Sequence, residues 1–591
     1  MVRTLNLGVL AHVDAGKTSL TERLLHSAGV IERPGSVDDG DTQTDSLALE
    51  RQRGITIKSA VVSFVVDDVA VNLIDTPGHP DFIAEVERVL SVLDGAVLVV
   101  SGVEGVQAQT RVLMRTLRRL RIPTLVFVNK MDRPTADAAR TVRAMAEKLT
   151  PSVVPLDDAD RLAEVLAEHD DELVEPYVDG QRSWVRAALV EQTRRAVVHP
   201  VFFGSAVSGA GVAELIAGIT EFLPAKESST DGPLSGTVFK VERGAGGEKI
   251  AYVRMFSGVL RPRERIGAGK VTALSVFGGG ELSAGRIGKV WGLSKIRIGD
   301  AVGAPRASAA SHFAPPTLES VVQPRDPSER GLLHSALAQL AEQDPLINLR
   351  EDFSVSLYGE VQKEVIQATL AAEYGIDVDF RETTTIHVKR PVGVGESVEV
   401  IATDSNPFLA TVGLRVEPGP SEFRLEVELG SLPFAFFRAV EESVGAELRR
   451  AEVRDCTVTM TRSGYWARQS RAHGGFDKSM SSTAGDFRAL AAVVLAEALR
   501  RAGTEVLEPI HRLRLEVPAD TLGAVSTALA KLRGVPLVPV LRGAVCELEA
   551  EIPAGRVHAF QQALPGLTRG EGVVEAEFDR YVPVTDSART G

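Results

Sequence analysis

The chain has 591 residues, 44% of them hydrophobic and 25% charged, and a formal net charge of −13 at pH 7. This length is too great for one hydrophobic core and predicts roughly four domains of about 150 residues each. The acidic balance argues against a protein whose whole surface binds nucleic acid, although it leaves room for a local basic patch. No apolar run reaches the ~18 residues of a membrane span, so the sequence predicts a cytoplasmic protein with no membrane partner.

The first predicted element is a strand that leads into a glycine-containing loop and then a helix. Residues 10–20 read LAHVDAGKTSL, and Gly16, Lys17 and Thr18 fill the last three places of a phosphate-binding loop. In such a loop backbone N–H groups surround the phosphates, the lysine reaches the outer two, and the hydroxyl binds Mg²⁺. Ala11 stands where the motif has its first glycine. Alanine can make this turn only if its φ stays negative. Taken alone, the loop also fits a strand-to-helix turn without a ligand.

The next strand, at residues 71–74, ends in polar residues that suit a nucleotide site. Asp75 follows the strand directly and can hold Mg²⁺, either itself or through water. The amide of Gly78 can meet the γ-phosphate. Ligands of open α/β sheets bind at the carboxyl ends of strands, which is where these residues fall.

Two later strands supply residues that suit a guanine base. The strand at residues 124–128 ends in Asn129, Lys130 and Asp132, and a carboxylate there accepts both N–H groups on the guanine edge. Adenine has no such pair and would leave a buried charge unmatched, so Asp132 predicts GTP over ATP. A strand at residues 200–203 then brings Ser205 and Ala206 to close over the base. The order of these motifs predicts a P-loop GTPase domain over residues 1–226, with GTP and Mg²⁺ as its ligands.

With these motifs in place, the chain resembles the translational GTPases, in which alanine at the first loop position is usual. The resemblance implies a GTP-binding loop made of Asp14, Ala15, Gly16, Lys17, Thr18 and Ser19. Residues 51–56 resemble the first switch, which implies that Thr56 contacts Mg²⁺ and the γ-phosphate only in the GTP state. His79 stands where the family places the residue that orients the attacking water, so His79, Thr56 and Lys17 are the expected catalytic residues. The alternative for His79 is a solvated histidine that opens a helix.

The rest of the chain predicts a series of smaller domains. Short alternating strands indicate a β-barrel domain over residues 233–308, after a linker at residues 227–232. A second linker at residues 309–316 precedes alternating helix and strand patterns, which indicate an α+β domain over residues 315–382.

A second split βαβ unit is expected at the C-terminus, over residues 510–584, and a separate segment fills residues 383–509. The predicted fold class is therefore multidomain α/β and α+β: a P-loop GTPase domain, a β-barrel, two split-βαβ (ferredoxin-like) domains and an inserted α+β tip domain. Cys456 and Cys546 are the only cysteines in the sequence and are expected to be buried free thiols.

This domain order resembles elongation factor G across nearly the whole chain. By resemblance, the partner is the 70S ribosome, with GTP and GDP as ligands and the protein a monomer away from the ribosome. The inserted domain would reach ribosomal RNA of the small subunit near the decoding centre.

Two stretches of the inserted domain resemble the tetracycline-resistance ribosomal protection proteins, especially the oxytetracycline-resistance branch. They lie around residues 404–414 and 464–488. The implied ribosome and drug-site tip comprises Asn406, Pro407, Phe408, Lys478, Ser479, Met480, Ser481, Ser482 and Thr483. Residues 449–488 also carry more Arg and Lys than Asp and Glu, together with aromatic side chains that can stack on bases. The alternative is a solvated loop whose aromatics pack beneath it.

The chain departs from these relatives at the tip. They commonly have Tyr-Ser-Pro-Val where residues 478–481 read KSMS, and a C-terminal helical extension after the last domain. Three functions stay open: a ribosome-dependent GTPase that releases tetracycline, a translocation factor with a diverged tip, and a GTP-controlled ribosome binder. The first is the leading hypothesis, and the third is the least expected, because Thr56 and His79 are both present.

Overall fold

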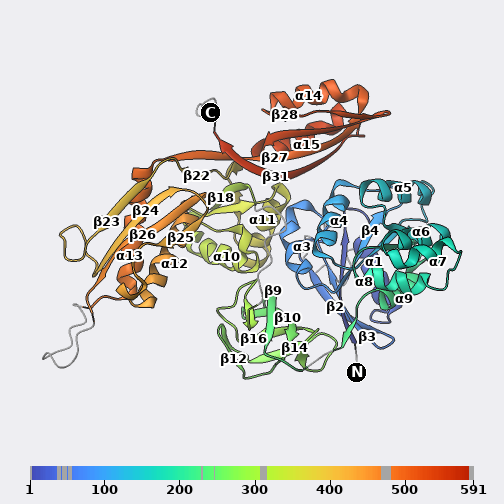
Figure 1. Cartoon of the computed structure of the whole chain (residues 1–591), viewed down its shortest axis with the longest axis horizontal. Helices are drawn as coiled ribbons and strands as arrows, with labels where there is room; N and C mark the ends of the chain where they lie inside the picture. The colour runs from blue at the N-terminus through green and yellow to red at the C-terminus, as the bar shows by residue number, and fades with distance from the viewer. Residues whose placement is uncertain are drawn as a thin grey trace. The chain divides into compact units, whose positions relative to one another are not determined.

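The computed structural model describes residues 3–35, 42, 50, 56–227, 230–244, 246–305, 316–467 and 481–584. The chain divides into two compact units, which Figure 1 draws in one colour scale. The first unit comprises Met1–Thr383 with Val573–Glu575, and the second comprises Thr384–Gly572 with Ala576–Gly591. Among the described residues, no helix has both the length and the apolar character needed to cross a membrane.

The first unit opens with a mostly parallel sheet in the strand order β2-β3-β1-β4-β5-β7-β6, with β8 paired antiparallel to β1. Its strands are β1 (Arg3–Ala11), β2 (Ala60–Val66), β3 (Val69–Asp75), β4 (Gly95–Ser101), β5 (Thr124–Asn129), β6 (Val153–Pro155), β7 (His199–Phe203) and β8 (Lys226–Glu227). The central strands are buried along their whole length, as expected for parallel strands covered on both faces. The linker predicted from residue 227 begins one residue too early, because Glu227 is still paired with Arg3.

Helices cover both faces of this sheet. They are α1 (Lys17–Ser27), α3 (Ile83–Leu90), α4 (Ala108–Leu120), α5 (Ala138–Lys148), α6 (Ala159–Glu168), α7 (Val174–Val178), α8 (Val185–Arg194) and α9 (Val212–Phe222), with short 3₁₀ turns η1 (Pro80–Phe82) and η2 (Asp171–Leu173). Residues of α1, α6, α8 and α9 share one hydrophobic core, and residues of α3, α4 and α5 share the other. Alternate residues of the strands point to the two cores, so that Val9 joins the first and Leu10 the second.

The next part of the unit is a small all-β domain. Its strands are β9 (Ser235–Arg243), β10 (Lys249–Ser257), β11 (Val259–Leu260), β12 (Arg265–Ile266), β13 (Gly269–Lys270), β14 (Ala273–Val276), β15 (Leu282–Ser283), β16 (Ile287–Trp291) and β17 (Ala301–Gly303). A sheet in the order β14-β16-β10-β9-β17 surrounds its own core, and the short strands predicted for this part of the chain are present. A buried ion pair attaches this domain to the parallel sheet, with Arg254 Nη2 3.0 Å from Asp94 Oδ2.

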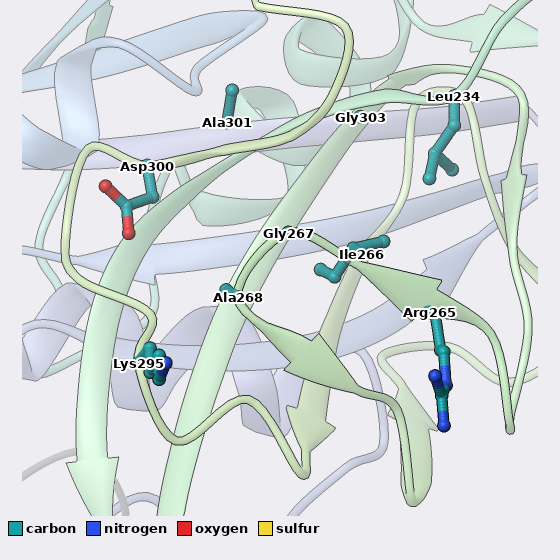
Figure 2. A pocket seen from close by; sticks show the side chains of 9 residues that line it. All are labelled: Leu234, Arg265, Ile266, Gly267, Ala268, Lys295, Asp300, Ala301 and Gly303. Atoms are coloured by element: carbon teal, nitrogen blue, oxygen red, sulfur yellow. The ribbon is translucent and has the colours of Figure 1, made fainter. Parts of the chain in front are cut away.

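A shallow cavity of about 510 Å³ opens on this all-β domain (Figure 2). Arg265, Lys295 and Asp300 provide its charged lining. The Asp300 carboxylate accepts a hydrogen bond from the Arg297 amide at 2.7 Å, so it closes a turn of its own chain. None of the residues predicted for the nucleotide site lines this cavity.

The third part of the unit is an α+β domain. It contains β18 (Leu318–Pro324), α10 (Arg330–Gln343), β19 (Ser354–Leu357), α11 (Glu360–Tyr374) and β20 (Val378–Phe380), with 3₁₀ turns η3 (Pro327–Glu329) and η4 (Pro345–Ile347). Strands pair antiparallel in the order β19-β18-β20, and both helices pack on them through one core. The linker predicted at residues 309–316 lies outside the described residues except for Pro316.

The second unit contains two sheets. One has the order β23-β24-β26-β25, and the other has the order β22-β27-β30-β28 with β29 on β30 and β31 on β27. Their strands are β22 (Val388–Pro391), β23 (Gly395–Glu399), β24 (Ala410–Pro418), β25 (Glu422–Leu425), β26 (Cys456–Tyr465), β27 (Thr504–Pro518), β28 (Val535–Pro536), β29 (Val540–Arg542), β30 (Val545–Pro553) and β31 (Val573–Pro583). The helices are α12 (Phe434–Arg450), α13 (Ala484–Ala502), α14 (Leu522–Lys531) and α15 (Ala554–Leu567), with turns η5 (Leu429–Ser431) and η8 (Ala519–Thr521).

Helices α12 and α13 pack on the β23–β26 sheet through a core that includes alternate residues of β24. The long strand β27 runs without a break through the predicted boundary between residues 509 and 510. Cys456 and Cys546 are both buried and free, as predicted. Burial raises the pKa of the Cys456 thiol to about 11, so this thiol stays protonated near pH 7.

Candidate GTP site

The phosphate-binding loop begins where β1 ends at Ala11 and finishes where α1 begins at Lys17. Gly16 caps the helix with φ 84°, and a Cβ placed there would lie 2.3 Å from the side-chain nitrogen of Asn129. The position therefore requires glycine for both its backbone and its space. Asp14 also has a positive φ, at 63°. Ala11, the last residue of β1, does not have a positive φ, which agrees with the limit that its side chain sets. The backbone N–H groups at the start of α1 form an anion site of the kind that binds phosphate.

Lys17, Thr18, Thr56 and Asp75 meet at the carboxyl ends of β1 and β3. Lys17 Nζ lies 2.5 Å from Asp75 Oδ1 and 3.1 Å from Thr56 Oγ1, and both side chains of the ion pair are buried. The hydroxyl oxygens of Thr18 and Thr56 are 3.2 Å apart. Two hydroxyls beside a carboxylate are oxygen ligands of the type that Mg²⁺ takes together with substrate phosphates. The described residues hold no cluster of three or more His, Cys, Asp or Glu side chains that could bind a metal without such help.

The segment after β3 lies against the phosphate-binding loop. Thr76 donates its hydroxyl proton to the Val9 carbonyl at 2.8 Å, and a Cβ on Gly78 would lie 3.2 Å from the Ala11 carbonyl oxygen. His79 precedes η1, and its Nδ1 accepts a hydrogen bond from the Asp81 amide at 3.2 Å. Because Nδ1 accepts, Nε2 is the ring nitrogen left for an external partner. His79 thus opens a helix, and its side chain is 26% exposed.

The two loops predicted to bind the base are tied to the phosphate-binding loop by one side chain. Asn129 donates from Nδ2 to the Ala15 carbonyl at 2.8 Å and accepts the Ala206 amide at 2.9 Å through Oδ1. Asn129 therefore fixes three loops relative to one another. Lys130 Nζ lies 3.0 Å from Glu104 Oε1.

The remaining base-loop residues keep separate surroundings. Asp132 is 34% exposed, with a carboxylate oxygen 3.9 Å from Arg133 Nε. Ser205 is buried and accepts the Ser208 amide at 3.2 Å through its hydroxyl. Asp14 is exposed beside Ala15, and Ser19 is half-buried in the first turn of α1.

Sequence reasoning missed two residues that shape this site. The Thr21 hydroxyl lies 3.3 Å from Asp75 Oδ1, one helical turn beyond Lys17, and its position on the inner face of α1 was the available signal. His12 Nδ1 lies 3.0 Å from Thr110 Oγ1. Burial lowers the pKa of His12 to about 4, so its ring is neutral at pH 7 and adds no charge to the loop.

The described part of the predicted tip consists of two segments that contact each other. The Ser482 hydroxyl donates to the Leu409 carbonyl, and the Leu409 amide lies 3.4 Å from Asp486 Oδ1. Thr483 and Asp486 form a capping box at the start of α13. Ser481 is buried, and Lys478, Ser479 and Met480 lie outside the described residues.

Within the first of these segments only one predicted residue is exposed. The Asn406 side chain is buried, and its amide donates to the Val400 and Ala410 carbonyls at 3.0 and 2.8 Å. Phe408 is half-buried against the core of the unit. Asn406 therefore shapes the loop, and Pro407 is its exposed member.

Comparison with known proteins identifies the family. Residues 2–225 match the family described as Elongation factor Tu GTP binding domain, and residues 505–590 match Elongation factor G C-terminus. The oxytetracycline resistance protein of Streptomyces rimosus is 48% identical, across 98% of this chain and 95% of its own length. This chain belongs to the tetracycline resistance protein family of translational GTPases. The predicted resemblance is confirmed, and this member of the family is a GTPase.

Other members of the family and a solved structure extend the match. Tetracycline resistance protein TetM of Streptomyces lividans is 46% identical, across 97% of this chain and 96% of its own length. TetP of Clostridium perfringens is 36% identical, across 98% of this chain and 95% of its own length. A crystal structure of a Thermus thermophilus protein superposes with a TM-score of 0.64 at 25% identity, covering 99% of this chain and 98% of that one. These matches confirm the predicted multidomain fold class of this family member.

Proposed function

We propose that this protein is a ribosome-dependent GTPase that binds the tetracycline-stalled ribosome and promotes release of the drug. The observation that carries the proposal is the convergence of Lys17, Thr18, Thr56 and Asp75 in a chain that matches tetracycline resistance proteins over nearly its whole length. The five predicted segments would then act as a nucleotide switch, a barrel, two split βαβ units and a ribosome-directed tip domain. Because its partner is the ribosome, the proposal places the protein in the cytoplasm, as a monomer between encounters.

The nucleotide would be held by residues that already share one end of the sheet. The start of α1 and Lys17 would bind the phosphates, and Asp132, with the loop of Ser205 and Ala206, would bind guanine. Thr18, Thr56 and Asp75 supply the oxygen atoms for Mg²⁺, which would neutralise charge on the phosphates. On nucleotide binding, Lys17 would contact the phosphates and lose part of its contact with Asp75. Nucleotide binding would therefore rearrange the group formed by Lys17, Thr18, Thr56 and Asp75.

Hydrolysis would depend on His79 and on the ribosome. The Nδ1 atom of His79 is engaged by its own turn, which leaves Nε2 to orient the attacking water. We expect slow turnover by the protein alone, because the 26% exposed imidazole meets bulk water until a partner covers it. The ribosome would supply that cover, and small-subunit RNA near the decoding centre would receive the tip.

A translation assay tests the proposed function. Purified ribosomes would be inhibited with tetracycline and supplied with GTP and this protein, and polypeptide yield would be the readout. Recovery of synthesis that requires GTP supports the proposal. No recovery at any protein concentration contradicts it.

Translocation is the second candidate, because residues 505–590 match the elongation factor G C-terminus. The same assay without drug and without elongation factor G separates the two. A translocation factor would restore movement of messenger RNA there, whereas a protein that only releases drug would not. A plain GTP-controlled binder would do neither.

Asp132→Asn is expected to weaken GTP binding by about 10- to 100-fold, because a hydrogen bond to a charged group is worth roughly 1.5–3 kcal/mol. The amide presents a donor where the carboxylate accepted, so xanthine nucleotide should gain affinity. Titration with fluorescent GTP and xanthosine triphosphate measures both changes. Asp157→Asn, an exposed position in the same domain, is the matched control. Equal GTP affinity for the two variants would show that Asp132 does not read the base.

A further inference from the structure

Helix α11 of the α+β domain begins without a capping side chain of its own. Its N-cap residue is Gly359, which makes no side-chain hydrogen bond. The first amides of a helix lack partners within the helix and normally bond to a side-chain oxygen at the N-cap. Here that oxygen comes from Asp81 of η1, whose Oδ2 accepts the amides of Val361 at 2.9 Å and Gln362 at 3.2 Å.

The same aspartate is linked to the predicted catalytic histidine. Its backbone amide donates to His79 Nδ1 at 3.2 Å, and its Oδ1 lies 3.6 Å from that nitrogen. One residue thus bonds the imidazole through its main chain and helix α11 through its carboxylate. The orientation of the imidazole is therefore coupled to the position of α11.

Gly359 leaves the space that this contact needs. A Cβ built on it would lie 2.4 Å from Asp81 Oδ1, closer than atoms can approach. Its backbone is fully extended, with φ −174° and ψ −175°, which other residues also adopt. Any side chain here would therefore displace the Asp81 carboxylate without straining the backbone of residue 359.

Apolar and ionic contacts hold the same surfaces together. Ile57, directly after Thr56, forms a small buried cluster with Phe82 and with Val365 of α11. Further along α3, Arg88 bonds to Asp344, which precedes η4. Helix α11 and its domain thus contact the segments that carry both Thr56 and His79.

We propose that Asp81 is a positioning residue for GTP hydrolysis, which fixes the His79 imidazole through its cap on helix α11. The inference rests on the proposed function, because the rate concerned is the ribosome-stimulated one. Movement of the α+β domain on the ribosome would then be transmitted to His79 through the cap. Asp81 itself contacts neither Lys17 nor Asp75 in the hydrogen bonds of the described residues, so its effect is on rate and not on nucleotide binding.

The test compares full-length variants in ribosome-stimulated GTP hydrolysis. Asp81→Ala removes the cap, and Gly359→Ala displaces it while leaving Asp81 and His79 in the sequence. Both should lower kcat by about tenfold, the scale of a modest misplacement of a catalytic group, with KM for ribosomes and GTP affinity within about twofold of wild type. Asp81→Asn keeps an acceptor oxygen and should retain most of the rate, because Asn and Asp cap helices about equally well.

Gly331→Ala is the matched control, since a Cβ on this α10 glycine meets no atom within 4 Å. Wild-type kcat in both Asp81→Ala and Gly359→Ala would overturn the inference. An equal loss in Gly331→Ala, or a loss that follows melting temperature or GTP affinity, would overturn it as well. If ribosomes failed to accelerate GTP hydrolysis by the wild-type protein, the proposed function would be wrong. The rates of the wild-type protein and the variants without ribosomes would then still decide whether Asp81 positions His79.

Discussion

Replacement of His79 by alanine should slow ribosome-stimulated GTP turnover by about 10²-fold or more while GTP affinity stays unchanged, because a positioned acid-base or water-orienting group contributes roughly that factor. Affinity should survive because the His79 ring bonds to its own turn through Nδ1 and not to the Lys17 and Asp75 cluster. Single-turnover hydrolysis with saturating ribosomes measures the rate, and nucleotide titration without ribosomes measures affinity.

His558→Ala is the control for this variant, since His558 is exposed on α15 in the second unit. Its turnover should match that of wild type. A His79→Ala protein that hydrolyses GTP at the wild-type rate would remove His79 from the mechanism. If the wild-type protein hydrolysed GTP at the same rate with and without ribosomes, the ribosome would have no part in the hydrolysis mechanism.

Deletion of residues 478–480 should abolish rescue of tetracycline-inhibited translation and leave ribosome-stimulated GTP hydrolysis within about twofold of wild type. The reason is that the hydrolytic groups lie in the other compact unit. The deletion stops short of Ser481 because Ser482 bonds to Leu409 and Thr483 caps α13, so a longer deletion would also damage the fold. Polypeptide yield and phosphate release, measured on the same ribosomes, are the two readouts.

A second variant tests whether the cap that Thr483 places on α13 contributes to rescue. Thr483→Ala removes the capping side chain of α13 and should cost about 1 kcal/mol of stability, with weaker rescue. Thr527→Ala, on the exposed face of α14, is the matched control.

Full rescue by the protein that lacks residues 478–480 would contradict a role for this segment in drug release. Loss of hydrolysis together with rescue would show that the two activities cannot be separated at the tip.

Much of the fold could be predicted because its signals are local. The buried strands β3, β5 and β7 are mostly apolar, and each ends at or next to polar residues. The helices at residues 330–343 and 360–374 repeat apolar positions at helical spacing, which a single sequence displays directly. The five domain segments and the roles of the individual site residues stay predictions.

Boundaries were harder to predict than elements. The strand β27 continues across residue 509 because its early residues pair with β22. No local sequence pattern predicts this pairing. Likewise, β8 forms at residues 226–227 because Arg3 and Thr4 of β1 precede the stretch that pairs with β4 and are free to pair with β8 on that side. Asn406 was predicted at the tip from resemblance, but its buried amide bonds within its own loop.

The sequence by itself determined the nucleotide-binding motifs, the family and the placement of most strands and helices, because these depend on residue identities within short windows. Only the tertiary structure decided which distant groups share a site. Asn129 joins loops that are far apart in the chain, and Asp81 caps a helix 280 residues later. Such contacts arise when separately folded layers pack, and a hydrogen bond between remote residues leaves no periodic trace in the sequence.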